Sequence, residues 1–196
     1  MAEAAVRRRD PDRRQRILTA AAELVAQRGY HDVGMAEIGA AAGVTGSAIY
    51  RHFDNKSAVL VAMFDRVIDD LSRDAGEIVT HGEPRAVLRQ LIRGQVAFVL
   101  TDRTLARVYH NEITNLPADD RHRLRRKQRM YLEEWVHVLA ALRPDTSDAE
   151  LRALAHAAIG GIQSTLFYQS GLPAEQLADL LCAAAEAVLF SATTPA

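Results

Sequence analysis

Apolar residues recur every three or four positions along almost all of the 196 residues of this chain. That spacing gathers them on one face of an α-helix, whereas a half-buried strand needs alternation at every second position, which no segment sustains. Alanine, the strongest helix former, occurs 34 times, and proline and glycine separate the periodic segments. The sequence therefore predicts an all-α fold of about nine helices.

Three helices are expected in the N-terminal part of the chain. In the first, Asp10 caps the helix, Pro11 takes its first position, and Gly29 suits its end. Two short helices fit residues 35–42 and 46–52.

Longer helices are expected in the rest of the chain. One starts near Lys56 or Ser57 and fades around residues 80–82. The later helices are expected to start at Pro84, at Thr101 or Asp102, at Asp119 or Asp120, at Ser147 with Glu150 completing a capping box, and at Pro173. The change from short to long helices predicts two domains, residues 1–55 and 56–196.

Several classes of protein are excluded by what the chain lacks. The single cysteine, Cys182, excludes an intrachain disulfide framework and a multi-thiolate metal site. The longest stretch without charged residues, 153–174, is too polar to span a membrane, and we expect a helix buried against protein on several sides. No apolar stretch follows the N-terminal arginines, so we expect no signal peptide and a cytoplasmic protein. No enzymatic motif is found, and we expect neither catalysis nor a cofactor.

Residues 34–56 form the most informative segment of the sequence. Its two short helices are joined by a tight turn at Gly43, where a left-handed backbone costs a residue without Cβ the least. A small core is expected from Ile38, Ala42, Val44, Ile49 and Phe53. This pattern is typical of a helix-turn-helix, whose second helix enters the major groove of DNA.

The motif Ala41-x-Gly43-Val44-Thr45-Gly46-Ser47-x-Ile49-Tyr50-Arg51-His52-Phe53-x-Asn55-Lys56 resembles that of the TetR family of bacterial transcriptional regulators. The resemblance covers roughly residues 17–60. It implies that Thr45, Tyr50, His52 and Lys56 contact phosphates and that Gly46, Ser47, Ala48 and Arg51 lie against bases. A plain helical hairpin would leave the cluster from Tyr50 to Phe53 unexplained, although Tyr50 itself could be half buried.

Two departures from the family pattern bear on how DNA would be read. Members often have threonine or serine where this chain has Gly34 and Met35, and some present a base-reading arginine where it has Ala36. Base readout is therefore expected to depend on Ser47, Arg51, the backbone at Gly46 and DNA shape.

A basic N-terminal arm precedes this segment. It comprises Arg7, Arg8, Arg9, Arg13, Arg14 and Arg16. Residues 1–56 hold nine basic and seven acidic side chains, so the chain's near-neutral net charge of −1 averages a basic end with a mildly acidic body. The arm can follow phosphates or reach the minor groove, or it can be a solvated tail.

The last two helices are expected to pair two copies of the chain, because a head of this size needs a second copy to read two half-sites. Family members form a four-helix bundle from such helices, and Gly160 and Gly161 allow close approach of the backbones. The residues expected at the interface are Ala158, Ile162, Leu166, Leu177, Leu181, Ala184 and Val188. The alternative is that these helices belong to the core of one protomer.

The middle helices place polar groups among apolar ones, as a small-molecule site requires. The resemblance implies an effector site in this domain. The residues expected to line it are Gln95, Phe98, Leu105, Tyr109, Glu112, Tyr131, Trp135, Ile162 and Thr165. Each of them could instead be ordinary core.

A basic run follows in Arg121, Arg123, Arg125, Arg126, Lys127 and Arg129. These residues span more than two helical turns and cannot share one face. They form either a solvated surface or, in part, a phosphate clamp at the mouth of the cavity, as an acyl-CoA thioester would need. Some TetR-like regulators respond to acyl-CoA thioesters.

The function expected from these features is that of a repressor. A homodimer would bind a pseudo-palindromic DNA operator and release it when a small, largely apolar effector moves the long helix that starts at Lys56. A transcriptional activator or a corepressor-type member of the family is the alternative. A different class, a helical di-iron carboxylate protein, is raised by the Glu-x-x-His spacing of Glu134 and His137, but no second such motif exists.

Overall fold

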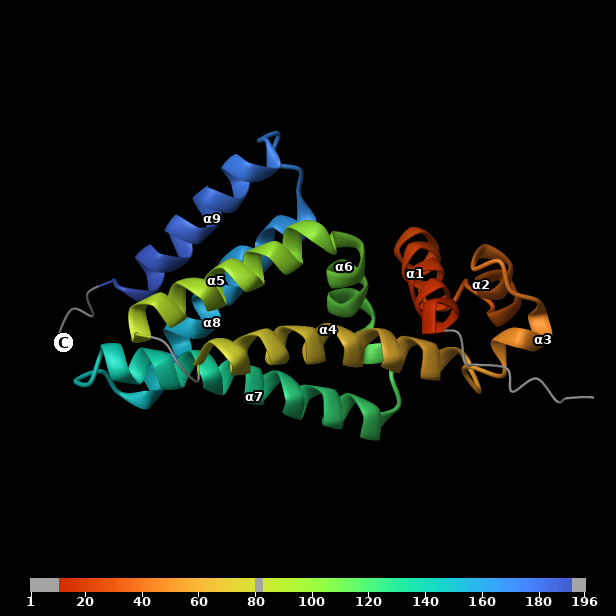
Figure 1. The fold of residues 1–196 in the computed structure, drawn as a ribbon, viewed down its shortest axis with the longest axis horizontal. Coiled ribbons are helices and arrows are strands. Elements are labelled where there is room, and N and C mark those ends of the chain that lie inside the picture. Colours follow the sequence, from red (N-terminus) through yellow and green to blue (C-terminus); the bar gives the residue numbers. More distant parts are fainter. Residues whose placement is uncertain (1–10, 80–82, 192–196) are drawn as a thin grey trace, which may run out of the picture. The chain divides into compact units, whose positions relative to one another are not determined.

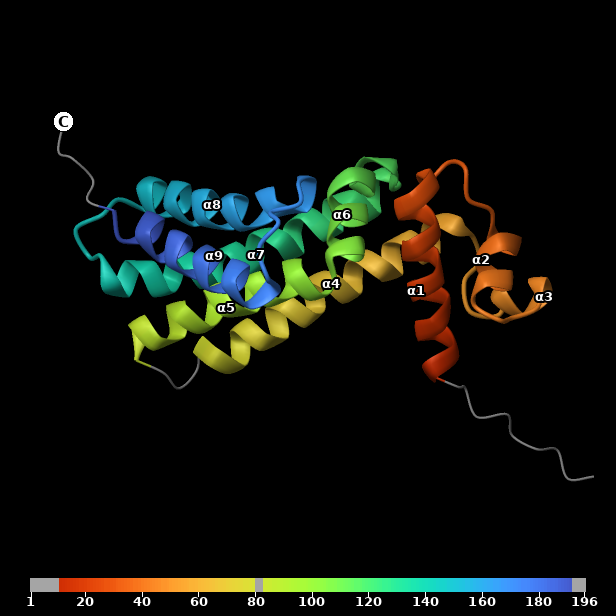
Figure 2. The same ribbon diagram turned by 90° about the horizontal axis from the view of Figure 1, so that it is seen from above.

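The computed structural model describes residues 11–79 and 83–191, and within these ranges the chain is helical and contains no strand (Figure 1, Figure 2). The all-α prediction is confirmed. The helices are α1 (Pro11–Arg28), α2 (Met35–Ala41), α3 (Gly46–Ile49), α4 (Lys56–Val79), α5 (Pro84–Thr101), α6 (Arg103–Glu112), α7 (Ala118–Leu142), α8 (Asp148–Ser164) and α9 (Ala174–Leu189), with short 3₁₀ helices η1 (Ile113–Asn115) and η2 (Thr165–Phe167). The arginines of the predicted arm at 7–9, and Asp10, lie outside the described residues.

The chain divides into two compact units, Met1–Met63 and Phe64–Ala196. Helix α4 begins at Lys56, as expected, and continues through the boundary between the units. The first unit extends beyond the boundary expected at Asn55, because the first turns of α4 bury Val59, Leu60 and Met63.

The first unit, which we call the head, has a small apolar core. Ile17 of α1, Ile38 of α2 and Ile49 of α3 are fully buried in it. Two glycines have the left-handed backbone that the sequence predicted for them: Gly29 (φ 81°) ends α1, and Gly43 (φ 67°) makes the turn between α2 and α3.

Helix α3 is shorter than the predicted 46–52. It ends at Ile49, and the backbone N–H groups of Arg51 and His52 donate to carbonyls three residues back, at 3.2 and 2.9 Å. This tighter turn brings Phe53 into the core of the head, where it is buried.

The core of the second unit is formed by α5, α7, α8 and α9, with α9 packed beside α5 and α8 (Figure 2). Trp135 of α7 is fully buried at its centre. Helix α8 begins with the predicted capping box, in which the Ser147 hydroxyl accepts from the Glu150 N–H and the Glu150 carboxylate accepts from the Ser147 N–H.

The charge-free stretch 153–174 is not one continuous buried helix. Helix α8 ends at Ser164 and is followed by η2 and a turn at Gly171 (φ 71°). One side of α8 is exposed in the protomer, at Ala157, Gly160 and Gly161. Within the described ranges, no helix combines the length and the hydropathy needed to cross a bilayer.

Candidate functional site

Five polar residues predicted to contact DNA lie in α3 or directly beside its two ends. Thr45 is the N-cap residue of α3, and its side chain makes no capping hydrogen bond. Thr45, Ser47 and Arg51 are exposed, the Tyr50 side chain is 56% exposed, and His52 is half buried. The head therefore presents several hydrogen-bond donors from one short stretch of chain, which is the arrangement that phosphate and base contacts need.

Ala48 does not belong to this exposed set. Its side chain is only 6% exposed and faces the core of the head. The inward face of α3 carries both Ala48 and Ile49, which sets Ala48 apart from the exposed residues, and its contact with a base stays a prediction.

Lys56 is engaged within the head. Its ammonium group donates to the carbonyl oxygens of Tyr30 at 2.6 Å and His31 at 3.1 Å, and lies 4.4 Å from the centre of the Tyr30 ring. These contacts tie the start of α4 to the segment between α1 and α2. An ammonium group has three N–H donors, so one donor remains for the predicted phosphate contact.

A second network holds the same segment. Arg28 donates to both carboxylate oxygens of Glu37 at 2.8 and 3.0 Å, and Glu37 accepts from the Gly34 N–H at 2.8 Å. The hydrogen bonds from Arg28, and then from Gly34, lower the pKa of Glu37 to about 2. The carboxylate therefore stays ionised and anchors the start of α2.

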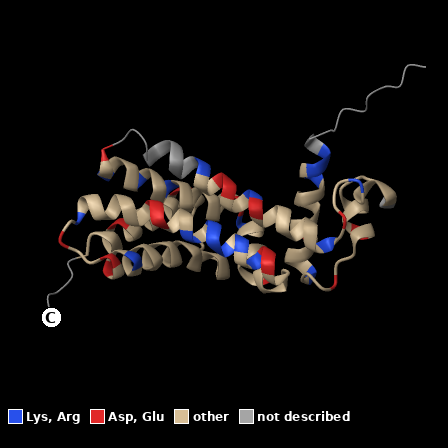
Figure 3. Cartoon of the chain, turned by 90° about the horizontal axis from the view of Figure 1, so that it is seen from below, with Lys and Arg blue, Asp and Glu red and all other residues tan. Residues whose placement is uncertain are grey.

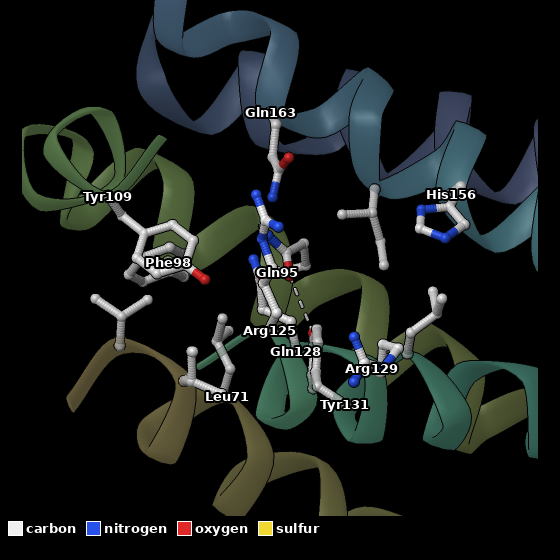
Figure 4. Close-up of a pocket in the computed structure, with 14 residues that line it drawn as sticks. Leu71, Gln95, Phe98, Tyr109, Arg125, Gln128, Arg129, Tyr131, His156 and Gln163 are labelled. Carbon is white, nitrogen blue, oxygen red and sulfur yellow. Dashed lines mark hydrogen bonds between the residues drawn. The ribbon is translucent and has the colours of Figure 1, made fainter. Parts of the chain in front are cut away.

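A cavity of about 310 Å³ lies in the second unit, between α4, α5, α6, α7 and α8 (Figure 4). This volume is at the lower end of the range for small-molecule sites, about 300–1,000 Å³. The cavity is lined by Val67, Ile68, Leu71, Gln95, Phe98, Tyr109, Arg125, Gln128, Arg129, Tyr131, Leu132, His156, Ile159 and Gln163. The lining contains two arginines and no carboxylate.

Four of the nine residues predicted for this site line the cavity: Gln95, Phe98, Tyr109 and Tyr131. The other five, Leu105, Glu112, Trp135, Ile162 and Thr165, do not. Trp135, Ile162 and Thr165 are buried in the core, and the Thr165 hydroxyl donates to the Ile162 carbonyl at 2.8 Å. Glu112 accepts from the Asn115 amide at 2.5 Å. Helical spacing alone does not tell the side of a helix that faces a cavity from the side that faces the core.

Helix α4 contributes an apolar wall to the cavity, and these residues were not predicted to line it: Val67, Ile68 and Leu71. The apolar repeat of α4 was visible, but nothing local separates its cavity-facing positions from its core-facing ones. Other lining residues that were not predicted are Gln128 and Leu132 of α7 and His156, Ile159 and Gln163 of α8.

The interior of the cavity contains unpaired polar groups. The Tyr131 hydroxyl lies 3.0 Å from Gln95 Oε1 and donates to it (Figure 4). Gln95 is 1% exposed, and neither its Nε2 nor the Tyr109 hydroxyl has a hydrogen-bond partner among the described residues. Burial raises the pKa of Tyr109 against the opposing effect of Arg125, so its phenol keeps its proton at neutral pH.

The basic run on α7 separates into groups with different partners. Arg123 and Lys127, one turn apart, donate to Asp65 of α4 at 2.6–2.8 Å, and Lys127 also reaches Asp69 at 2.8 Å. Burial alone would raise the pKa of Asp65, but the hydrogen bonds from Arg123 and Lys127 outweigh it and lower that pKa. Figure 3 shows Lys and Arg positions (blue) close to Asp and Glu positions (red) on helices of the second unit.

The remaining arginines of the run have other surroundings. Arg121 donates to the Thr114 carbonyl at 3.2 Å. Arg125 and Arg129, again one turn apart, line the cavity. Arg129 also borders a neighbouring surface hollow, together with Arg126, Arg123, His122 and Asp119. The members of the run therefore differ in their surroundings: some form hydrogen bonds or ion pairs, and Arg125 and Arg129 line the cavity, where a phosphate clamp stays a prediction.

Five of the seven residues predicted for the dimer interface are buried within the protomer: Ala158, Ile162, Leu166, Leu177 and Leu181. They form part of the core of the second unit, as in the alternative that these helices belong to the core of one protomer, and their contribution to a dimer interface stays a prediction. Ala184 is exposed and Val188 is half buried. The exposed apolar surface of this region comprises Ala157, Gly160, Gly161, Phe167, Tyr168, Leu172, Leu180 and Ala184.

Glu134 and His137 do not form part of a metal site. Within residues 11–79 and 83–191, no group of three or more His, Cys, Asp or Glu side chains is arranged to hold a metal ion. The di-iron alternative has no support in this donor set.

Comparisons with known proteins identify the two parts of the chain. Residues 17–63 match the model of bacterial regulatory proteins of the tetR family, and residues 81–167 match that of the tetracyclin repressor-like C-terminal domain. The HTH-type transcriptional repressor KstR2 of Rhodococcus jostii (strain RHA1) is 30% identical over 131 residues, 66% of this chain and 64% of the repressor's length. The chain thus aligns with slightly less than two thirds of that relative.

Solved structures share the fold. A TetR-family transcriptional regulator from Bordetella parapertussis 12822 superposes with a TM-score of 0.80 at 23% identity, over 95% of this chain and 100% of the other. The structure of AibR in complex with isovaleryl coenzyme A and operator DNA superposes with a TM-score of 0.74 at 22% identity, over 88% and 97%. With both family models matching in order along the chain, this protein belongs to the TetR family of bacterial regulatory proteins.

Proposed function

We propose that the protein is a ligand-responsive transcriptional repressor that binds operator DNA as a homodimer. One observation carries the proposal: the chain combines a head that exposes polar side chains of a helix-turn-helix with a second unit that contains a cavity of about 310 Å³. Helix α4 begins in the DNA-reading head and also lines the sensing cavity. A chain that combines these two parts suits a regulator that responds to a small molecule.

The effector we propose is an amphipathic anion of the acyl-CoA thioester class. The apolar wall from α4, with Phe98 and Leu132, suits an acyl chain, and Arg125 and Arg129 suit a negatively charged group. Arg129 also borders the adjacent hollow with Arg126, which offers a surface for further phosphates. The complex of AibR with isovaleryl coenzyme A supports this choice by analogy of fold.

The exposed apolar surface on α8, η2 and α9 supports the homodimer. Leu180 and Phe167 are each 56% exposed, and small exposed residues of α8, such as Gly160, would let a second backbone approach closely. Several large exposed apolar side chains in one region are typical of an interaction site. Two copies would give two heads for two half-sites of an operator.

Release of the operator, and with it relief of repression, follows if the effector binds the DNA-free conformation more tightly than the DNA-bound one. Helix α4 carries cavity residues Val67, Ile68 and Leu71 in the second unit and begins in the head at Lys56. A displacement of α4 on ligand binding would reach the head through a continuous helix. The affinity for DNA would then fall by the ratio of the effector's affinities for the two states.

The test is DNA binding with and without effector. Fluorescence anisotropy with DNA from upstream of the protein's own gene is expected to show specific binding that acyl-CoA thioesters weaken and coenzyme A alone does not. Arg129→Ala is expected to weaken the response to thioester without altering DNA binding. Arg107→Ala, on the exposed surface of α6 and outside the cavity lining, is the matched control.

Three outcomes would contradict the proposal. Absence of specific DNA binding would refute the regulator, and binding that no thioester changes would refute the effector class. Transcription in vitro from the same DNA decides the direction, since activation by the ligand-free protein would refute repression.

A further inference from the structure

The cavity interior holds hydrogen-bond donors without acceptors. Gln95 Oε1 accepts a hydrogen bond from the Tyr131 hydroxyl. The two N–H groups of Gln95 Nε2 have no hydrogen-bond partner among the described residues. The Tyr109 hydroxyl is likewise unpartnered, and it points toward the middle of the cavity (Figure 4). These groups come from two helices, α5 and α6, and both residues line the same cavity.

Such groups are rare in native proteins, because a buried polar atom that gives up water normally finds another partner. The lining offers little to satisfy them: it contains no carboxylate, and its charged members are both arginines. Because burial keeps the Tyr109 phenol protonated, this hydroxyl also has a hydrogen to donate. A ligand that carries an acceptor into the cavity would satisfy these donors.

The volume limits what that ligand can be. The 310 Å³ cavity is at the lower end of the range for small-molecule sites, so it suits a short group rather than a whole coenzyme A thioester. A short acyl chain with its carbonyl group fits this space. The large polar part of a thioester would remain outside, beyond Arg125 and Arg129, which are exposed.

We propose that Gln95 and Tyr109 form a subsite for the carbonyl oxygen of a short acyl group. This inference rests on the proposed function, because it assumes that the cavity is the effector site. It adds which atom of the effector the cavity binds. Gln95 Nε2 donates one hydrogen bond to the carbonyl oxygen and Tyr109 donates another. Tyr131 holds the Gln95 amide with its Nε2 free for the ligand. Gln95 and Tyr109 are then residues that determine specificity.

The first test compares two ligands that differ only in the carbonyl group. Butyryl-CoA carries the oxygen, and S-butyl-CoA, the corresponding thioether, has a methylene group in its place. The chain has one tryptophan, Trp135, whose ring centre is 6.3 Å from that of the cavity residue Tyr131, so its fluorescence reports occupancy. We expect the thioester to bind about ten- to a hundredfold more tightly than the thioether, because the thioether leaves the buried donors of the cavity without an acceptor.

Variants locate the preference. Gln95→Leu is expected to remove most of it while the affinity for the thioether is kept or improved, and Tyr109→Phe is expected to reduce it. Gln163→Leu, at a half-buried position of the lining on α8, is the control and should keep it. A merely structural role for Gln95 would weaken both ligands equally, and that result would overturn the subsite.

A second pair of probes separates failure of the subsite from failure of the proposed effector class. Cyclohexanone and methylenecyclohexane have the same ring and size and carry no coenzyme A. If neither coenzyme A compound binds but cyclohexanone binds more tightly and loses its advantage in Gln95→Leu, the subsite stands and the effector class falls. Equal affinity for both members of each pair, or no binding of either ketone or thioester, would overturn the subsite.

Discussion

The ion-pair cluster between α4 and α7 provides a quantitative test of how this structure is held together. Asp65 accepts two hydrogen bonds from Arg123 and one from Lys127 at 2.6–2.8 Å. The substitution Asp65→Asn keeps the shape of the side chain and removes its charge. Lys127 retains Asp69 at 2.8 Å, and Arg123 retains Asp120 at 3.6 Å.

The expected loss in free energy of unfolding is about 1–2 kcal/mol. An exposed ion pair contributes ~0–1 kcal/mol, and breaking a fully buried one costs ~3–5 kcal/mol. The Asp65 side chain is 25% exposed and its two partners are about a third exposed, so solvent screens these charges in part. In the variant, Arg123 and Lys127 each keep a carboxylate partner. Neither cation is left unpaired, which limits the loss in free energy of unfolding.

Urea unfolding followed by Trp135 fluorescence measures this effect, because the only tryptophan is buried in the core of the same unit. The matched control is Glu133→Gln. Glu133 also pairs with an arginine, Arg152, at 2.8 Å, but on the exposed surface, and no measurable change is expected. Equal effects of the two substitutions would refute the reasoning that partial burial gives the Asp65 cluster its strength.

The pH dependence has a definite sign. The pKa of Asp65 is lower in the folded protein than its unfolded value of 3.8. Its contribution is therefore complete above the unfolded value and is lost as the pH falls through the folded one. The difference between the wild type and Asp65→Asn should shrink below about pH 4. A difference that stays constant down to acid unfolding would contradict the ionic origin.

Three further predictions concern the head and the exposed surface. If Arg51 contacts a base, Arg51→Ala should weaken specific DNA binding by about ten- to a hundredfold and change the binding of unrelated DNA little. Anisotropy titrations with both DNA sequences measure the two affinities. Leu180→Glu should shift the protein toward the monomer in light scattering while leaving its helical circular dichroism intact; an unchanged dimer mass would exclude this surface. Glu37→Gln should destabilise the head at neutral pH but not near pH 2. The pKa of the Glu37 carboxylate is lowered from 4.5 to about 2, so its contribution to stability is present above pH 4.5 and lost toward pH 2. Amide hydrogen exchange in the head measures the difference from the wild type, and a pH-independent difference would argue against the Arg28 pair.

Local chemistry made much of the fold predictable. Gly29 and Gly43 have left-handed backbone conformations that suit a residue without Cβ, and both were assigned to helix ends or turns. Ser147 and Glu150 form a capping box within four residues, so their spacing is sufficient to place the start of α8. Interactions of this range depend on neighbours in the chain and need no knowledge of tertiary packing.

The candidate sites were predicted less completely, because helical periodicity tells which residues share a face and not what that face meets. Leu177 and Leu181 lie on one face of α9, as expected, but the face packs into the protomer's own core. Ala48 likewise faces inward, although its neighbour Ser47 is exposed. For α9 the periodicity gave the correct face, whereas the assignment of Ala48 rested on the family resemblance and not on periodicity.

By itself, the sequence determined that this chain is helical, where most helices begin, and that its N-terminal part resembles a helix-turn-helix. Only the tertiary structure decided the roles of the two basic pairs of α7. Arg123 and Lys127 share one face and meet Asp65, while Arg125 and Arg129 share another and line the cavity. The physical reason is that an i,i+4 spacing is a property of one helix, whereas an ion pair or a cavity requires a second helix whose position is set by packing the whole core.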